Sequence, residues 1–145
     1  MARLLEFVGN HPFLSGAIIA TGVLLFINET RLRMRGLFAI SPFDAVRLVN
    51  KGAAVVDIRE PARYESGHIT DAANVQPDGL AAHVAGNIKP KKAVLLVCDN
   101  GSVSARYAAA IRKAGRDNAF ALKGGLTAWL QENLPTTAAA DPGDD

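Results

Sequence analysis

The stretch AVLLVCDNGSVSARYAAA, residues 93–110, decides the fold of this chain. Residues 93–97 form an apolar run, which predicts a fully buried strand. Residues 99–104 are rich in Gly, Ser and Asn, and these residue types disfavour the interiors of strands and helices. Strong helix formers follow at residues 105–114. The stretch therefore predicts a buried strand, a short polar turn and a helix, in that order.

Cys98, the only cysteine of the chain, lies where this strand meets the turn. In such a geometry, backbone N–H groups of the turn and the helix start form a concave ring around the sulfur. A ring of this kind binds anions and stabilises a thiolate, which makes Cys98 a candidate nucleophile. The alternative is that Cys98 is a small buried hydrophobic residue without chemistry. The polar loop favours the nucleophile, because a structural cysteine needs no cradle of N–H groups.

Composition and charge limit the classes of protein that the chain can represent. Its 145 residues, 49% of them hydrophobic, suffice for one domain with a real core. A single cysteine excludes an intrachain disulfide and a cysteine-rich metal site, and suits a reducing compartment. We expect no metal and no cofactor. The net charge of +2 comes from residues 1–35, so the neutral remainder lacks the basic surface of a nucleic-acid-binding domain.

Residues 7–28 carry no formal charge and are long enough to span the hydrocarbon core of a membrane. They lack the amphipathic pattern of a helix buried in a soluble core. Residues 28–31 also lack the small-x-small pattern of a signal-peptide cleavage site. We therefore expect a retained transmembrane helix at 7–28, after an N-terminal segment (1–6) and before a basic juxtamembrane linker (29–36).

The flanks of this span predict its orientation. Three arginines follow it: Arg31, Arg33 and Arg35. Before the span, Arg3 is offset by Glu6. The positive-inside rule then leaves the N-terminus outside and residues 30–145 in the cytoplasm. The span also contains small residues that permit close contact with a membrane-protein partner: Gly16, Ala20 and Gly22.

The soluble domain is expected at residues 37–134, with strands and helices in alternation. Short strands are expected at 37–40, 53–58, 72–75, 93–97 and 120–122. Helical segments are expected after the N-cap Ser41, at 61–64, at 80–88, at 105–114 and after 124–125. This alternation predicts a parallel sheet covered by helices on both faces. Residues 135–145 lack aromatic residues and periodicity, and are expected to be a disordered tail.

Three segments carry a resemblance to a known family. They are VVDIREPARYESGHITDAANV (55–75), the Cys98 loop, and LKGGLTAW (122–129). In residues 40–134 the chain resembles the rhodanese-like sulfurtransferase domain. With its N-terminal span it resembles the bacterial single-pass, membrane-anchored members of that family. The resemblance implies a small α/β domain with a parallel sheet flanked by helices, held at the cytoplasmic face of the inner membrane.

The resemblance also implies a reaction. Cys98 would take a sulfur atom from a small donor, form a persulfide, and pass the sulfur to a thiol or to cyanide. The loop around the persulfide would consist of Asp99, Asn100, Gly101, Ser102, Val103 and Ser104. The family usually carries cations where this chain has Asp99 and Val103. An acidic neighbour opposes a thiolate and a dianionic donor, so a catalytically weak interaction module at the membrane stays open as the alternative.

Two arginines are candidate accessory residues. Arg59 could lie near the sulfur, or pair with Asp57 in a purely structural role. Arg106, one turn into the helix after the loop, is the other cation near the expected pocket. His68 lies in an E-x-G-H-I element (residues 65–69) that is chiefly structural in the family, although a general-base role is the alternative. A related phosphatase chemistry is disfavoured, because its longer loop needs an arginine that clamps phosphate.

Overall fold

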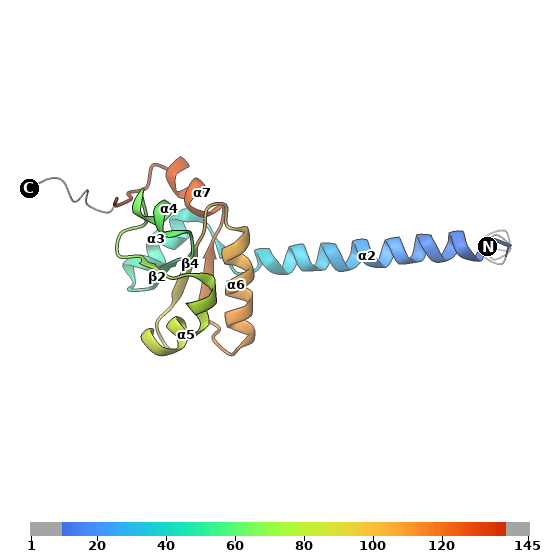
Figure 1. Cartoon of the computed structure of the whole chain (residues 1–145), viewed down its shortest axis with the longest axis horizontal. Coiled ribbons are helices and arrows are strands. Elements are labelled where there is room, and N and C mark those ends of the chain that lie inside the picture. Colours follow the sequence, from blue (N-terminus) through green and yellow to red (C-terminus); the bar gives the residue numbers. More distant parts are fainter. Residues whose placement is uncertain (1–9, 139–145) are drawn as a thin grey trace, which may run out of the picture. The chain divides into compact units, whose positions relative to one another are not determined.

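Five short parallel strands form the sheet of the structure, a computed structural model that describes residues 10–138 (Figure 1). The strands are β1 (Ala39–Ile40), β2 (Ala54–Asp57), β3 (Ala73–Asn74), β4 (Val94–Val97) and β5 (Ala119–Leu122). Their order in the sheet is β1-β5-β4-β2-β3, and every neighbouring pair is parallel. Strand β4 is therefore central, and all four of its residues are buried.

Helices cover both faces of this sheet, as predicted. The helices of the domain are α3 (Pro42–Asn50), α4 (Pro61–Glu65), α5 (Pro77–Asn87), α6 (Ser102–Lys113) and α7 (Gly125–Gln131). On one face, side chains of α5 and α6 pack on alternate strand residues, such as Val94 and Leu96. On the other face, side chains of α3 and α7 pack on the intervening residues, such as Leu95 and Val97. Consecutive strand residues point to opposite faces, so β4 is apolar throughout.

Local signals in the sequence explain where α3 begins. Ser41 has an extended backbone, and its hydroxyl oxygen accepts a hydrogen bond from the Asp44 backbone N–H at 3.2 Å. Pro42 occupies the first helical position, where its missing N–H costs nothing. The predicted cap of this helix is confirmed.

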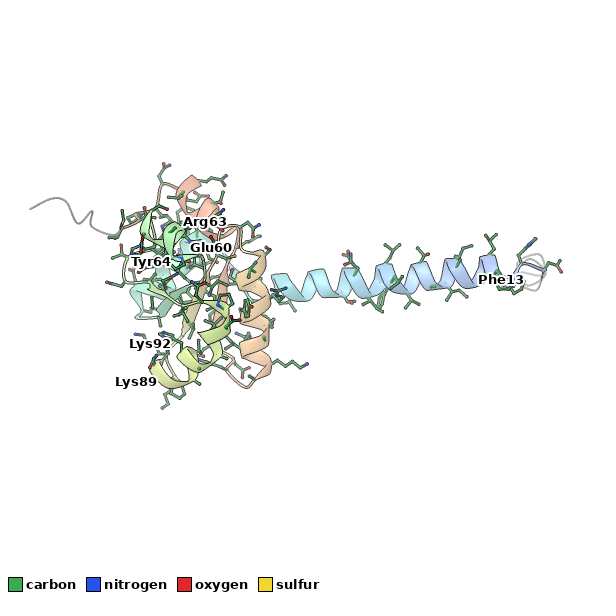
Figure 2. The ribbon with its side chains drawn as sticks, viewed as in Figure 1. Phe13, Glu60, Arg63, Tyr64, Lys89 and Lys92 are labelled. Atoms are coloured by element: carbon green, nitrogen blue, oxygen red, sulfur yellow. The ribbon has the colours of Figure 1, made fainter. Side chains whose placement is uncertain are left out.

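The N-terminal helix α2 (Pro12–Gly36) belongs up to Met34 to a unit separate from the domain, which begins at Arg35. Its segment Pro12–Thr30 is 19 residues long with a mean hydropathy of 1.6, which is long and apolar enough to cross a membrane. Large apolar side chains of this segment are exposed, with Phe13 at 94% (Figure 2). The helix continues to Gly36, so the segment expected to be a linker, 29–36, is helical. Residues 1–9, and with them the expected N-terminal segment 1–6, lie outside the described residues.

The beginning of the expected disordered tail is packed against the domain. His68 and Thr137 form an antiparallel bridge, with N–H···O distances of 2.9 and 2.8 Å. The indole Nε1 of Trp129 donates a hydrogen bond to the Pro135 carbonyl at 2.9 Å. The expectation of disorder is therefore wrong for residues 135–137, because backbone and indole partners hold a segment that has no apolar pattern. Residues 139–145 lie outside the described part of the chain.

Candidate active site

Cys98 directly follows the central strand β4, at the carboxyl end of the sheet. Ligands of open parallel α/β sheets bind at this edge. The side chain is 5% exposed and belongs to the core cluster between the sheet and helices α5 and α6. A fully buried strand thus holds the sulfur at the boundary between the core and the polar loop.

Two backbone N–H groups point at the sulfur of Cys98. The Gly101 N–H donates to Sγ at 3.1 Å, and the Ser104 N–H donates at 3.4 Å. The thiol in turn lies 3.3 Å from Ser104 Oγ, and that hydroxyl donates to the Gly101 carbonyl at 3.2 Å. Gly101 has a φ of 84°, a conformation that favours glycine. This geometry is the partial ring of donors expected from the sequence.

The polar loop is shorter than the sequence suggested. Helix α6 begins at Ser102, so the last three of the six predicted loop residues form its first turn. The side-chain oxygen of Asn100 accepts hydrogen bonds from the Ser102 backbone N–H at 3.1 Å and hydroxyl at 2.7 Å. Such a side-chain bond starts a turn, which explains why the helix begins early. Val103 is exposed and Ser104 is fully buried.

Helix α7 holds the loop from the other side. The Cys98 carbonyl accepts a hydrogen bond from the Leu126 N–H at 2.9 Å, and the Asp99 carbonyl accepts one from the Thr127 N–H at 3.1 Å. Gly125 has a φ of 61°, and a Cβ built there would lie 2.5 Å from the Asp99 carbonyl oxygen. Only glycine fits a backbone approach of this kind. The LKGG segment therefore positions the loop.

Asp57 and Arg59 form a buried ion pair behind the loop. The Arg59 guanidinium donates to both carboxylate oxygens of Asp57, with Nη2 at 2.7 Å from Oδ2. The same Nη2 also donates to the Gly67 carbonyl at 2.7 Å. Both side chains are at least nine-tenths buried. The structural pairing of Arg59 with Asp57 is therefore present. It uses Nε and Nη2 of the guanidinium and leaves Nη1 without a bond to Asp57.

The carboxylate of Asp99 lies against two arginines. Arg63 Nη1 donates to Asp99 Oδ2 at 2.9 Å, and Arg59 Nη1 lies 3.9 Å from Oδ1. That the acidic Asp99 opposes a thiolate and a dianionic donor stays a prediction, and the two guanidinium groups beside the carboxylate offset part of its charge. Arg63, on α4 beside Tyr64 (Figure 2), is a site residue that the sequence reasoning missed. Arg63 lies in a one-turn helix 36 residues before Asp99, so no local sequence pattern indicated that the two side chains would meet.

Arg106 and His68, the other two candidate residues, form no hydrogen bond or ion pair with the Asp99 carboxylate within the described part of the chain. The exposed Arg106 side chain places its guanidinium 5.5 Å from the Tyr107 ring centroid. His68 is buried, its Nδ1 lies 2.9 Å from the Tyr64 carbonyl oxygen, and its ring stacks on that of Tyr64 at 3.8 Å. Of the two predicted accessory arginines, Arg59 is the one beside the loop. The contacts of His68 favour a structural role.

The surroundings of the Tyr64 phenol shift its pKa. Its hydroxyl donates a hydrogen bond to the Ala72 carbonyl at 2.6 Å. Burial raises the pKa of Tyr64 above its ordinary value of 10.0, and the negative charge of Asp57 raises it further. Ionisation of the phenol is therefore disfavoured in the folded protein.

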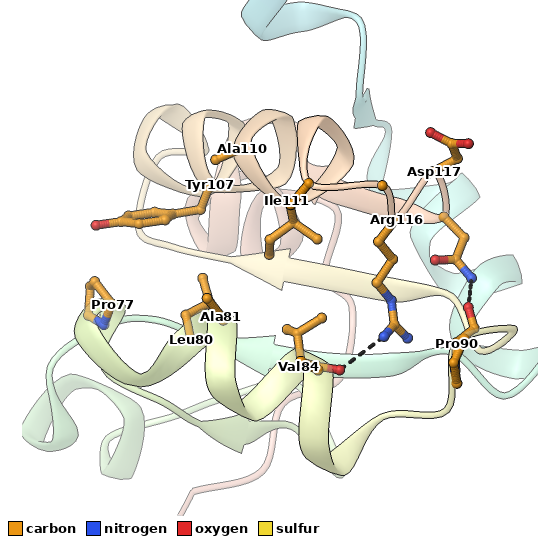
Figure 3. A pocket seen from close by; sticks show the side chains of 14 residues that line it. Pro77, Leu80, Ala81, Val84, Pro90, Tyr107, Ala110, Ile111, Arg116 and Asp117 are labelled. Carbon is orange, nitrogen blue, oxygen red and sulfur yellow. Dashed lines mark hydrogen bonds between the residues drawn. The ribbon is translucent and has the colours of Figure 1, made fainter.

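Two of the hollows formed by the described residues differ in size and character. A cleft of about 250 Å³ lies beside the loop and is lined by Arg59, Ser66, Gly67, Asp99, Leu126, Thr127, Leu130 and Thr136. A larger apolar groove of about 680 Å³ lies between α5 and α6 (Figure 3). Its lining includes Arg116, whose guanidinium donates to four carbonyls around the end of α5, and no residue of 98–104. Within residues 10–138, no group of three or more His, Cys, Asp and Glu side chains could hold a metal ion.

Comparisons with known proteins agree with this geometry. The model of the rhodanese-like domain matches residues 41–132. The uncharacterized protein YibN of Escherichia coli strain K12 is 35% identical over 138 residues, which cover 93% of this chain and 96% of YibN. The thiosulfate sulfurtransferase GlpE of Pseudomonas entomophila is 37% identical over 90 residues, or 62% of this chain and 82% of GlpE.

Solved structures show the same fold. The polysulfide-sulfur transferase homodimer of Wolinella succinogenes superimposes with a TM-score of 0.65 at 20% identity. The match covers 83% of this chain and 93% of that one.

Proposed function

This chain belongs to the rhodanese-like domain family, and on that premise we propose that it is a sulfurtransferase with Cys98 as its nucleophile. The observation that carries the proposal is the contact of the Cys98 sulfur with the N–H groups of Gly101 and Ser104. A negative charge on sulfur is stabilised there by donors that are already in place. The similarity to GlpE supports a small sulfur donor and a thiol acceptor.

The proposed reaction has two steps, each a displacement at sulfur. The Cys98 thiolate attacks the outer sulfur of a donor such as thiosulfate, a Cys98–S bond forms, and the donor's S–S bond breaks with release of sulfite. An acceptor thiolate or cyanide then attacks the outer sulfur of the persulfide, and the electron pair returns to Cys98. Both steps carry a negative charge on the sulfur next to the loop. The N–H groups of Gly101 and Ser104 are placed to stabilise that charge, and neither step requires a cofactor.

Mass spectrometry of the purified protein tests this proposal directly. After exposure to thiosulfate, polysulfide or another persulfide, we expect the intact protein to gain the mass of one sulfur atom. An acceptor thiol or cyanide should remove it. The Cys98→Ser variant should gain nothing, since the chain has no other cysteine. If no donor loads the wild-type protein, the sulfurtransferase proposal is wrong.

We further propose that α2 anchors the chain in the bacterial inner membrane, crossing it once. The supporting observations are the 19-residue apolar segment Pro12–Thr30 and the exposure of its large side chains. The arginines that follow it favour an N-terminus outside and a cytoplasmic domain. A protein anchored in this way should remain in the membrane fraction after washing with high salt or alkali.

A catalytically weak interaction module at the membrane is the second candidate function. It is favoured by the absence of a cation at positions 99 and 103, where Val103 instead exposes an apolar side chain. The loading experiment separates the two functions, because a module without chemistry gains no sulfur from any donor.

A further inference from the structure

Small side chains face each other across the groove of about 680 Å³ between α5 and α6 (Figure 3). Ala81 and Ala85 on α5, and Ala110 and Ala114 on α6, line the groove and are exposed. The two alanines of each helix are four positions apart, so they share one face of that helix. Because alanine has no side chain beyond Cβ, the two helices leave a space between them that longer side chains would fill.

The floor of this groove is apolar and belongs to the core. Leu80, Val84 and Ile111 line it, and all three are buried members of the core cluster on this face of the sheet. The core packs these side chains in place, so the apolar surface that they offer to the groove is fixed. A preformed hollow of this size and lining is typical of binding sites for small apolar ligands.

One end of the groove carries a positive charge that no carboxylate balances. Nη1 and Nη2 of Arg116 donate to four backbone carbonyls around the end of α5. Its Nε is buried and has no hydrogen-bond partner. Among residues 10–138, no carboxylate lies within ion-pair distance of this guanidinium. Carbonyl groups satisfy hydrogen bonds but bring no negative charge, so the charge of Arg116 lacks a counter-ion.

Neighbouring side chains make this end more positive. The turn 89–92, whose carbonyls bond to Arg116, contributes three exposed lysines: Lys89, Lys91 and Lys92. Pro90 in the same turn lines the groove beside Arg116 (Figure 3). Asp117 also lines the groove, but it is exposed, so solvent screens its charge more than that of the half-buried Arg116. The groove therefore combines an apolar body with one cationic end.

We propose that the groove between α5 and α6 binds an elongated apolar acid, with its hydrocarbon body between the helices and its carboxylate at the Arg116 end. The charges select this class of ligand, because a neutral molecule leaves Arg116 without a counter-ion and a cation is repelled. No residue of 98–104 lines the groove, so this site is separate from the loop of the proposed sulfur transfer.

Protection of an introduced cysteine tests the site in the full-length chain. The chain is placed in phosphatidylcholine nanodiscs, so that no detergent competes for the groove, and carries Cys98→Ser, which removes the only native thiol. Ala110→Cys then puts a thiol in the groove wall, and Ala82→Cys puts one on an exposed part of α5 outside the lining. We expect saturating octanoate to slow maleimide modification at position 110 about fivefold or more, and to leave position 82 unchanged. Octanamide has the same length without the charge and should be about tenfold less potent, because it cannot form a charge-assisted pair with Arg116.

Filling the groove gives an independent measurement. Ala81→Leu adds apolar bulk between the helices, while Ala82→Leu adds the same side chain at the next position, outside the lining. Both positions are exposed on α5 and leucine is a good helix former, so both variants should fold. By titration calorimetry, with empty nanodiscs as the blank, Ala81→Leu should weaken octanoate binding about tenfold. Ala82→Leu should leave it unchanged.

Equal protection at positions 82 and 110, or none at either, would overturn the proposal. So would equal potency of octanoate and octanamide, since the charge of Arg116 would then select nothing. Protection at position 110 that rises with protein concentration, without octanoate, would show that a second copy of the chain covers the groove, and the proposal would again be wrong. Binding of octanoate that survives Ala81→Leu would place the ligand elsewhere.

Discussion

At the scale of single residues, Ser104 combines three roles at the sulfur. Its backbone N–H and its hydroxyl both lie within 3.4 Å of Cys98 Sγ, and its side chain is fully buried. The hydroxyl can accept a hydrogen bond from the thiol and, after rotation, donate one to the thiolate. It also donates to the Gly101 carbonyl, which holds the loop closed.

Ser104→Ala is therefore expected to lower the rate of Cys98 persulfide formation about tenfold, which corresponds to about 1.4 kcal/mol. The variant keeps the backbone N–H, so part of the stabilisation remains. Single-turnover loading, followed by mass spectrometry, measures the effect. Ser104→Thr retains the hydroxyl and should recover most of the rate. An unchanged rate in Ser104→Ala would show that the hydroxyl does not act on the sulfur.

A second prediction at this scale concerns Gly125. Gly125 and Gly115 both have positive φ angles, 61° and 101°, but a Cβ at Gly115 meets nothing within 4 Å. Gly115→Ala should therefore cost only backbone strain, about 1 kcal/mol of unfolding free energy, and leave sulfur transfer intact. Gly125→Ala should cost at least about 3 kcal/mol and slow persulfide formation, because the methyl group would displace the Cys98 loop.

Urea unfolding followed by circular dichroism, together with the loading assay, compares the two glycine variants. Similar losses for both would mean that the close approach of α7 to the loop has no energetic consequence.

At the scale of elements, the one-turn helix α4 links the loop to the sheet. Arg63 reaches Asp99, while Tyr64 on the same helix packs on His68 and bonds to Ala72. The helix has no side-chain cap of its own. Its position therefore depends on these contacts, and of the two α4 side chains that make them Tyr64 is more buried than Arg63.

The raised pKa of Tyr64 makes this attachment sensitive to high pH. The folded state favours the neutral phenol, so the stabilisation is fully present below pH 10 and is lost as the pH rises through the raised value. Tyr107→Phe leaves Tyr64 as the only tyrosine, and its absorbance titration should show a pKa above 10. Tyr64→Phe should lower stability at pH 8 and flatten its decline above pH 10, relative to Tyr107→Phe. An ordinary pKa in the first variant would contradict this account.

Elements with local signals could be predicted, and contacts between distant elements could not. The apolar run before Cys98 and the Ser41 cap predicted β4 and α3, because burial and capping follow from residues within one turn or strand. The early start of α6 depends on one side-chain bond of Asn100. The position of Arg63 and the bridge between His68 and Thr137 join residues far apart in sequence. No periodicity marks such partners.

At the scale of the whole molecule, the arrangement of the chain across a membrane is the main prediction. Cys98 is too buried to report its side of the membrane reliably, so we design the test with introduced cysteines in the Cys98→Ser background. With a membrane-impermeant thiol reagent, Ala2→Cys should be labelled in intact cells. Lys91→Cys, at an exposed turn of the domain, should be labelled only after permeabilisation. The reverse pattern would invert the orientation, and labelling of both in intact cells would exclude a single cytoplasmic domain.

Trp129 gives the molecule a built-in optical reporter. It is the only tryptophan of the chain, so any change in indole emission comes from this one ring. The ring is 3% exposed and bonded to Pro135, while the helix that carries it binds the carbonyls of Cys98 and Asp99. Its fluorescence should therefore respond to two segments: the Cys98 loop, which would carry the sulfur, and residues 135–137, which pair with His68. If sulfur loading moves the Cys98 loop, the emission wavelength or intensity of Trp129 should change, and the change can be followed in real time without a label.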